Sequence, residues 1–274
     1  MKPFRRLNAR RLPGALACTS RTNTALACAA RLRATLPGAI LALALALALA
    51  SCASAPGSAR TGADGAFAPA VPSTVRSFLD DNGWDLGSYS LSDLSDLGRY
   101  RAHLRRYEVA AGADELWAAY RRTPPAEAWT TPMTAFGAAW DPDRGALVEP
   151  PGHELAAFAP GQVFALELTV AGIARLPAAF RMSRIDDHSR VIEFVYLEKN
   201  KSNGMQCLSF RDIASMDGSP RCVIEHASWY SSGNAFRDRR LYAPFHARIL
   251  DAFHRNVLAR AGFRLLSIDG KAAR

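Results

Sequence analysis

The sequence lacks the short motifs that mark many catalytic and metal-binding sites. It contains no Gly-x-Ser-x-Gly elbow, no phosphate-binding glycine loop, no Cys-x-x-Cys and no His-Glu-x-x-His. Nothing in the sequence therefore favours an α/β-hydrolase, a P-loop protein, a thioredoxin-like oxidoreductase or a zincin. We expect no cofactor and no metal, and catalytic residues stay unknown.

Acidic residues are missing from the N-terminal segment. Residues 1–51 contain eight of the 34 basic residues and none of the 25 acidic ones, which leaves 26 basic against 25 acidic residues in the remainder. The sequence pI near 9.7 therefore describes this segment and not the rest of the chain. A basic pI is typical of nucleic-acid-binding proteins, but this excess lies in a segment that we expect to be removed. We expect no nucleic-acid partner.

The apolar run at 38–50 is too short to cross a membrane, because a spanning helix needs about 20 residues. The run alternates Leu and Ala from Leu41 to Ala50, follows a basic stretch and is followed by small residues. This order is typical of an export signal peptide. We assign residues 1–51 to a signal peptide.

The end of this run, Leu49-Ala50-Ser51-Cys52, resembles the bacterial lipobox. The resemblance implies cleavage between Ser51 and Cys52 and acylation of Cys52, whose several acyl chains would anchor the protein stably in a membrane. Ala53 stands where Asp would favour the inner membrane, so the resemblance implies the periplasmic face of the outer membrane. A plain secretory signal with an accidental cysteine is the alternative.

The mature chain divides into a tether and one domain. Residues 52–72 are mostly small and polar, cannot bury a core, and predict a flexible tether behind the acylated cysteine. Residues 73–270 form the domain. Its cysteines, Cys207 and Cys222, lie on the two strands of a hairpin that turns near 216–219, about five positions out of register and on opposite faces. We favour two thiols over a disulfide, which would need a different register.

Periodicity predicts an α+β domain. We expect short helices at 75–81 and 113–122, a strand at 99–109 and a long loop with little regular structure at 130–160. A meander of antiparallel strands follows at 163–171, 178–185, 191–198, 205–213 and 221–230. Pro244 then opens a long amphipathic helix that continues to about residue 261.

This order resembles the START-like or SRPBCC helix-grip superfamily. The stretch from Tyr107 to Trp117, through Trp129, is similar to the family's first strand, short helix and following tryptophan. The resemblance covers about residues 97–265 and implies an antiparallel curved sheet gripping a long C-terminal helix. Another antiparallel α+β sandwich is the alternative. Trp117 and Trp129 are better explained as core than as site residues.

Strand parity predicts the wall of a pocket. If Ser209, Arg211 and Glu225 face solvent, the opposite face of these strands and of their neighbour is mainly aromatic and aliphatic, as an apolar ligand requires. The pocket residues are then Phe194, Tyr196, Leu208, Phe210, Ile224, His226 and Tyr230. His226 and Tyr230 would orient a polar group of the ligand. The alternative is that the terminal helix fills this space and His226 is a core histidine with its hydrogen bonds satisfied.

Three functions fit this reading. The preferred one is an envelope lipoprotein that binds a hydrophobic or amphipathic small molecule or a lipid. A cavity enzyme of the cyclase or hydrolase kind would use His226 with Glu167 or Tyr196. A protein-binding envelope module with a closed core is the third.

Two further sets of residues are better explained without a site. His246 and His254 lie too far apart on one helix to share a metal unless His226 completes the set. Arg237, Arg239 and Arg240, with Asp238, could meet an anionic headgroup, but local ion pairs in a solvated loop are the better explanation.

Overall fold

The computed structural model describes residues 70–170 and 172–273. The signal peptide, Ser51, Cys52 and most of the tether lie outside the described residues. Within the described ranges, no helix is both long enough and apolar enough to cross a membrane.

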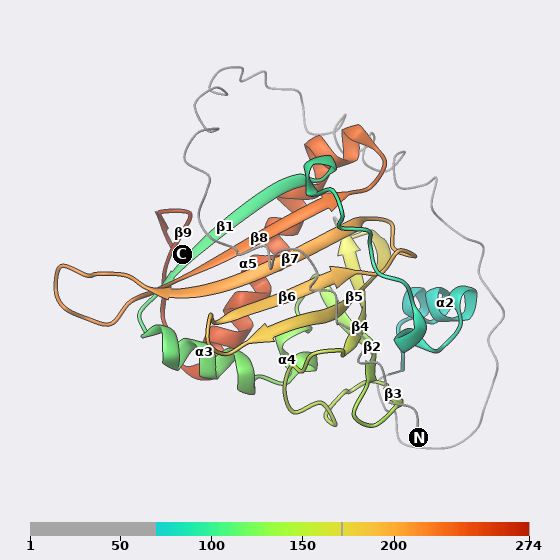
Figure 1. Ribbon diagram of the computed structural model, residues 1–274, viewed down its shortest axis with the longest axis horizontal. Coiled ribbons are helices and arrows are strands. Elements are labelled where there is room, and N and C mark those ends of the chain that lie inside the picture. Colours follow the sequence, from blue (N-terminus) through green and yellow to red (C-terminus); the bar gives the residue numbers. More distant parts are fainter. Residues whose placement is uncertain (1–69, 171, 274) are drawn as a thin grey trace, which may run out of the picture. The chain divides into compact units, whose positions relative to one another are not determined.

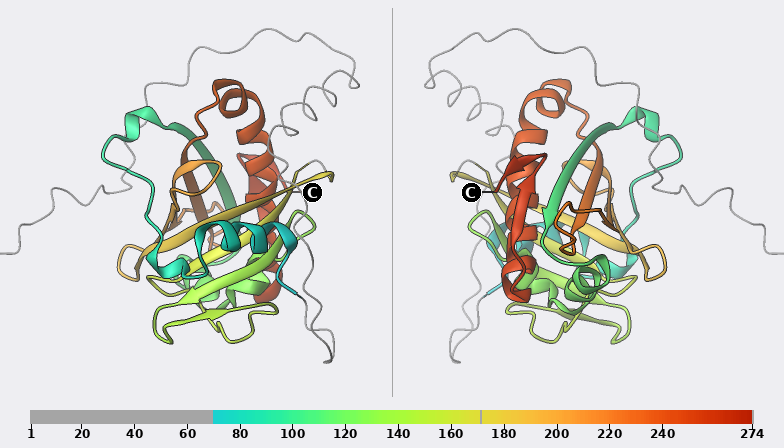
Figure 2. Two further views of the ribbon diagram at one scale, coloured as in Figure 1. Left: turned by 90° about the vertical axis from the view of Figure 1, so that its right-hand side faces the viewer. Right: turned by 90° about the vertical axis from the view of Figure 1, so that its left-hand side faces the viewer.

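Ten strands of the described chain form one antiparallel sheet in the order β10-β9-β1-β8-β7-β6-β5-β4-β2-β3 (Figure 1). Their bounds are β1 Arg101–Val109, β2 Thr134–Asp141, β3 Ala146–Val148, β4 Val163–Val170, β5 Ala174–Asp186, β6 Val191–Tyr196, β7 Asn203–Asp212, β8 Cys222–Ser231, β9 Leu265–Ile268 and β10 Lys271–Ala272. The sheet curves around the long helix (Figures 1 and 2).

Helices cover both faces of the sheet. They are α2 Ser73–Asn82, α3 Ala113–Arg122, α4 Pro125–Trp129 and α5 Tyr242–Ala261, with 3-10 turns η1 Leu86–Ser88 and η2 Leu97–Arg99 and a π-helical turn η3 Arg237–Leu241. Helices α3, α4 and α5 lie on the concave side, and α2 packs on the convex side against β2, β4 and β5. This is the helix-grip α+β fold that the sequence predicts.

Helix α5 follows from its sequence pattern. Ile249, Phe253 and Val257 recur every four residues and are buried, with exposed fractions of 5%, 1% and 0%. The helix ends at Gly262, which adopts the left-handed conformation with φ of 74° that favours glycine. One apolar stripe therefore faces the sheet along the length of the helix.

The hairpin register is confirmed. Residues of β7 and β8 pair from Asn203↔Ser231 to Asp212↔Cys222, the register that a turn near 216–219 predicts. Cys207 lies opposite Ala227, and the two buried cysteines are not joined by a disulfide. Strand parity puts their side chains on opposite faces of the sheet.

The prediction of a long irregular loop at 130–160 is wrong, because β2 and β3 lie within it. Strand β2 is covered by α2 on one face and by the main core on the other, so most of its residues are buried. A strand buried on both faces has no polar–apolar alternation to detect. Its small residues, from Thr134 to Ala139, then resemble a loop.

Strands β9 and β10 were also not predicted. They form a two-residue hairpin at Asp269-Gly270, where φ is 51° and 75°. Asp-Gly is among the strongest hairpin signals in a sequence, and it was available here between Leu265–Ile268 and Lys271.

Candidate binding site in the helix grip

All seven predicted pocket residues are buried, and each lies on the strand face that looks toward α5. The apolar ones, Phe194, Leu208, Phe210 and Ile224, belong to the main core. Aromatic rings from the concave-side helices pack on them. The ring centroids of Tyr120 and Phe210 are 4.8 Å apart, those of Trp129 and Phe194 are 6.1 Å apart, and Trp129 stacks on Phe253 at 4.3 Å. Side chains of α3, α4 and α5 therefore occupy the space in front of the apolar wall.

The polar residues of the wall join a buried series of hydrogen bonds that we call the polar chain. Its members are Tyr120, His254, His226, Gln206, Tyr196 and Tyr242. The heavy-atom distances are 2.5 Å from Tyr120 Oη to His254 Nδ1, 3.0 Å from His254 Nε2 to His226 Nδ1, 2.7 Å from His226 Nε2 to Gln206 Oε1, 2.6 Å from Gln206 Nε2 to Tyr196 Oη and 2.8 Å from Tyr196 Oη to Tyr242 Oη. The polar chain links α3, α5, β8, β7 and β6.

The chemistry of the groups fixes the protons in the polar chain. The amide oxygen of Gln206 can only accept, so His226 Nε2 carries a proton and donates it. In a neutral imidazole the other nitrogen then accepts, so His226 Nδ1 accepts from His254 Nε2. By the same rule His254 Nδ1 accepts from the Tyr120 hydroxyl. All these donors point the same way along the chain.

Burial keeps both of these histidines neutral. It lowers the pKa of His226 well below its ordinary value, and the neighbouring His254 lowers it further. It lowers the pKa of His254 to about 3, with a further contribution from the positive charge of Arg105. His226 is therefore a core histidine with both nitrogens hydrogen-bonded, which is the alternative to a pocket residue that the sequence also allowed.

Beside the polar chain lies a second group, which we call the unsatisfied cluster: His103 of β1, Ser228 of β8 and His246 of α5. His103 and Ser228 are directly opposite each other in the β1–β8 register. The ring centroids of His103 and His246 are 6.0 Å apart. Ser228 Oγ, His103 Nδ1 and His246 Nδ1 are buried atoms with no hydrogen-bond partner in the described part of the chain.

The cluster is uncharged, and only its member His103 is partly exposed. Burial lowers the pKa of His246 to about 3, aided by His103, and burial likewise lowers the pKa of His103. Ser228 is 0% exposed and His246 6%, whereas His103 is half-buried. A hydroxyl and two neutral imidazoles can each donate or accept, so together they suit an uncharged polar group such as a hydroxyl or a carbonyl.

The pairing of His226 with Glu167 is not formed. Glu167 lies on the convex side of the sheet, where Oε2 accepts a hydrogen bond of 2.7 Å from Thr74 of α2 and Oε1 lies 3.3 Å from Arg175. Parity explains this, because Val163 and Ala165, which share its face, belong to the convex-side core. Tyr196 meets His226 only through Gln206.

The expected solvated loop with local ion pairs is wrong, because the residues between β8 and α5 form the π-helical turn η3 and Asp238 pairs with none of its three arginines. Asp238 is buried and accepts hydrogen bonds from the backbone and hydroxyl of Ser232, and Arg237 donates to the carbonyls of Ser232 at 2.7 Å and Lys201 at 2.9 Å. Arg239 and Arg240 are exposed. Among residues 70–170 and 172–273, no group of three or more His, Cys, Asp or Glu side chains could hold a metal.

Sequence reasoning missed several members of the site. Alternation in the strand predicted at 99–109 puts His103 and Arg105 on its polar side, yet they face α5, while Leu104 on the other side is 43% exposed. The signal that could have found them is the histidine pair on α5. Two histidines on the inner stripe of a helix require polar partners on the sheet that it covers.

Comparison with known proteins supports no site residue. No protein-family model matches the chain, and a search of curated proteins finds no similar sequence. Among solved structures, a point mutant of norcoclaurine synthase from Thalictrum flavum is similar with a TM-score of 0.39 and 17% identity, over 59% of this chain and 97% of that one. Major latex-like protein 151 from Panax ginseng gives 0.41 and 12%, over 59% and 97%. A Mycobacterium smegmatis protein gives 0.38 and 14%, over 60% and 92%.

Proposed function

We propose that this protein is a lipid-anchored envelope protein whose helix-grip domain binds a small amphipathic molecule. The uncharged polar group of that molecule is held by Ser228, His103 and His246. Its apolar part lies among the aromatic side chains at the same end of the domain, where the Tyr230 and Tyr242 rings stack at 3.6 Å.

The observation that carries the proposal is the convergence of three buried atoms without partners. A buried donor or acceptor left unbonded costs about 1–3 kcal/mol. The neighbouring polar chain, by contrast, bonds both nitrogens of His226 and of His254. Three other buried atoms of the described chain, in Arg105, Trp129 and Arg237, also lack a partner, but only the cluster brings two imidazoles and a hydroxyl together. A ligand that bonds the cluster recovers this cost on binding.

The charge state of the cluster selects the ligand. Neutral imidazoles offer no cation to a carboxylate or phosphate, and an ion entering the buried site would have to lose its hydration. A hydroxyl or carbonyl group loses less hydration and can meet Ser228 Oγ and both imidazoles. We therefore expect an alcohol, ketone, ester or amide with an apolar body.

The test is native mass spectrometry of the protein purified in a mild detergent, followed by extraction of any bound molecule. The wild type should carry a small uncharged amphiphile. Ser228→Ala and His246→Phe should lower its occupancy. Ser209→Ala, on the opposite face of the sheet, is the matched control and should retain it. If the cluster holds only ordered water in a crystal structure and no molecule co-purifies, the binding proposal is wrong and a closed core remains.

In this proposal the domain lies at the periplasmic face of the outer membrane and is anchored there through Cys52. The Leu-Ala run, the sequence Leu49-Ala50-Ser51-Cys52 at its end and the following Ala53 support this location. Radioactive palmitate supplied to growing cells should label the native protein and not Cys52→Ser. Cys28→Ser, in the segment expected to be removed, should be labelled like the native protein. Equal labelling of the Cys52→Ser variant, or no labelling of the native protein, would contradict the anchor.

A further inference from the structure

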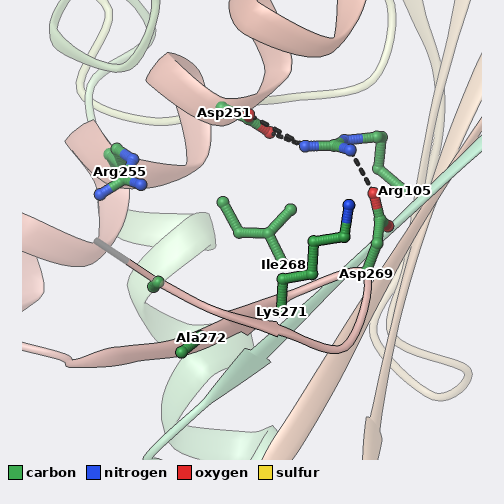
Figure 3. A pocket seen from close by; sticks show the side chains of 8 residues that line it. Arg105, Asp251, Arg255, Ile268, Asp269, Lys271 and Ala272 are labelled. Carbon is green, nitrogen blue, oxygen red and sulfur yellow. Dashed lines mark hydrogen bonds and ion pairs between the residues drawn. The ribbon is translucent and has the colours of Figure 1, made fainter.

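A second polar region lies outside the helix grip, where the β9–β10 hairpin passes beside α5 (Figure 3). A cleft of about 580 Å³ opens there. Five charged residues line it, together with the apolar side chains of Ile268, Ala272 and Ala273. A cleft of this size can take a small organic molecule.

The two carboxylates of the cleft are already engaged. Arg105 lies between them, with its guanidinium 2.7 Å from Asp251 Oδ1 and ion-paired with Asp269. Asp251 also accepts a hydrogen bond of 2.9 Å from the Tyr107 hydroxyl, and Asp269 accepts one of 2.9 Å from the backbone of Arg106. These carboxylates are therefore poor partners for any other cation.

The remaining two charged residues are cations without partners. Arg255 of α5 and Lys271 of β10 are exposed, and their side chains make no hydrogen bond or ion pair with any described residue. Figure 3 shows them on either side of Ile268. Three cations against two carboxylates give the cleft a net formal charge of +1. The cleft thus offers positive charge and apolar surface together.

The hairpin holds Lys271 in place. Asp269 and Gly270 both have positive φ, as a tight two-residue turn requires, and Lys271 follows directly. The Asp269 backbone N–H donates to Arg106 O at 2.8 Å, so the turn is fastened to β1. These contacts set the backbone position of Lys271 beside α5, so binding an anion needs the side chain to become ordered but not the turn to move.

We infer that this cleft binds the phosphate group of a small organic phosphate or of a lipid headgroup. Arg255 presents a planar fork of donors to the phosphate oxygens, and Lys271 adds a compact charge. The organic part of the ligand lies on Ile268, Ala272 and Ala273. This site is separate from the unsatisfied cluster, whose neutral groups suit an uncharged ligand, and it does not depend on the proposed function.

The test is titration calorimetry of the purified protein, in an uncharged detergent, with inorganic phosphate and with glycerol 3-phosphate. Both should bind saturably, and glycerol 3-phosphate should bind more tightly because it also contacts the apolar residues. Arg255→Gln and Lys271→Gln should each weaken binding about tenfold or more, since each removes charge-assisted hydrogen bonds. Arg248→Gln, exposed on α5 but not part of the cleft, is the control and should leave binding unchanged.

The source of the phosphate is distinguished with vesicles and the Cys52→Ser chain, which cannot be acylated there. Cosedimentation with phosphatidylglycerol vesicles but not phosphatidylcholine vesicles, lost in the Arg255→Gln/Lys271→Gln double variant, identifies a headgroup. Binding of glycerol 3-phosphate without cosedimentation identifies a soluble phosphate. The inference is overturned if neither phosphate binds, or if the double variant binds both as tightly as the wild type. Neither result bears on the molecule held by the unsatisfied cluster.

Discussion

Two neighbouring groups of buried polar residues differ in whether their atoms are hydrogen-bonded. The polar chain bonds both nitrogens of His226 and of His254, whereas the unsatisfied cluster of His103, Ser228 and His246 leaves a buried atom of each residue unbonded. Both lie between the same sheet and the same helix. The hydrogen bonds of the polar chain stabilise the fold, whereas we propose that the cluster bonds a group of the ligand.

Acid should produce the largest effect. His226, His246 and His254 have lowered pKa values in the folded protein, while an unfolded imidazole titrates near 6.5. As the pH falls below 6.5, the histidines of the unfolded chain become protonated while those of the folded chain stay neutral. The free energy of unfolding, which is highest above pH 6.5, therefore decreases toward pH 3. Each of these histidines should lower the free energy of unfolding by about 1.4 kcal/mol per pH unit in this range.

Urea unfolding at a series of pH values measures this slope. The groups facing these histidines include Arg105 of β1, Tyr120 of α3 and Asp251 of α5. His246→Phe should make the slope shallower by about 1.4 kcal/mol per pH unit. An unchanged slope in this variant would show that His246 is protonated in the folded protein.

Breaking the polar chain at its centre should have the next largest effect. His226→Leu removes the partners of Gln206 Oε1 and His254 Nε2, and each buried group left unbonded costs about 1–3 kcal/mol. We expect the free energy of unfolding in urea to fall by about 2–5 kcal/mol. His188→Leu, at an exposed turn, should change it by less than about 0.5 kcal/mol. Equal effects of the two substitutions would mean that the polar chain contributes nothing.

Arg105 lies at the border of the two parts, two residues from His103 on the same face of β1. Its side chain is 16% exposed, and Arg105→Met leaves Asp251 and Asp269 without their shared cation. We expect a loss of about 1–3 kcal/mol, less than for a fully buried pair. Arg106→Met, on the opposite face, removes a more exposed pair with Glu225 and should cost at most about 1 kcal/mol in the same measurement. The reverse order would contradict the assignment of faces on β1.

The smallest effect should come from two buried serines that differ only in their bonding. Ser228→Ala removes a hydroxyl without a partner, so the ligand-free protein should keep its stability or gain up to about 1 kcal/mol. Ser92 is also buried, but its hydroxyl donates to Tyr196 O and accepts from Gly204 N, both at 3.0 Å. Ser92→Ala should cost about 1–2 kcal/mol. A loss of that size in Ser228→Ala would show that its hydroxyl has a partner in the protein, such as water.

The sequence predicted the fold further than it predicted the site. Period-two alternation and the stripe of α5 located the meander and the helix, and the burial of β7, β8 and α5 follows that pattern most closely. Strand β2 is hard to predict because both of its faces are buried, and β9 and β10 because they are too short to show an alternating pattern on either side of Asp269-Gly270. The burial of His226 and Tyr230 followed from parity. Gln206 lies on the same face of the neighbouring strand as His226, whereas the pairing of His226 with His254 could not be predicted, because it depends on the rotation of α5 over the sheet.

The hydrogen bonds that tie α5 to the sheet have a mechanical consequence. The helix is bonded to the strands at Tyr242 in its first turn and again at Asp251 in its third, nine positions and about 14 Å further along its axis. His246 lies between these two attachments. A short molecule beside His246 needs the helix to move only between them, whereas a longer one has to break one of the attachments. We therefore expect these bonds to limit the length of any molecule that enters beneath α5.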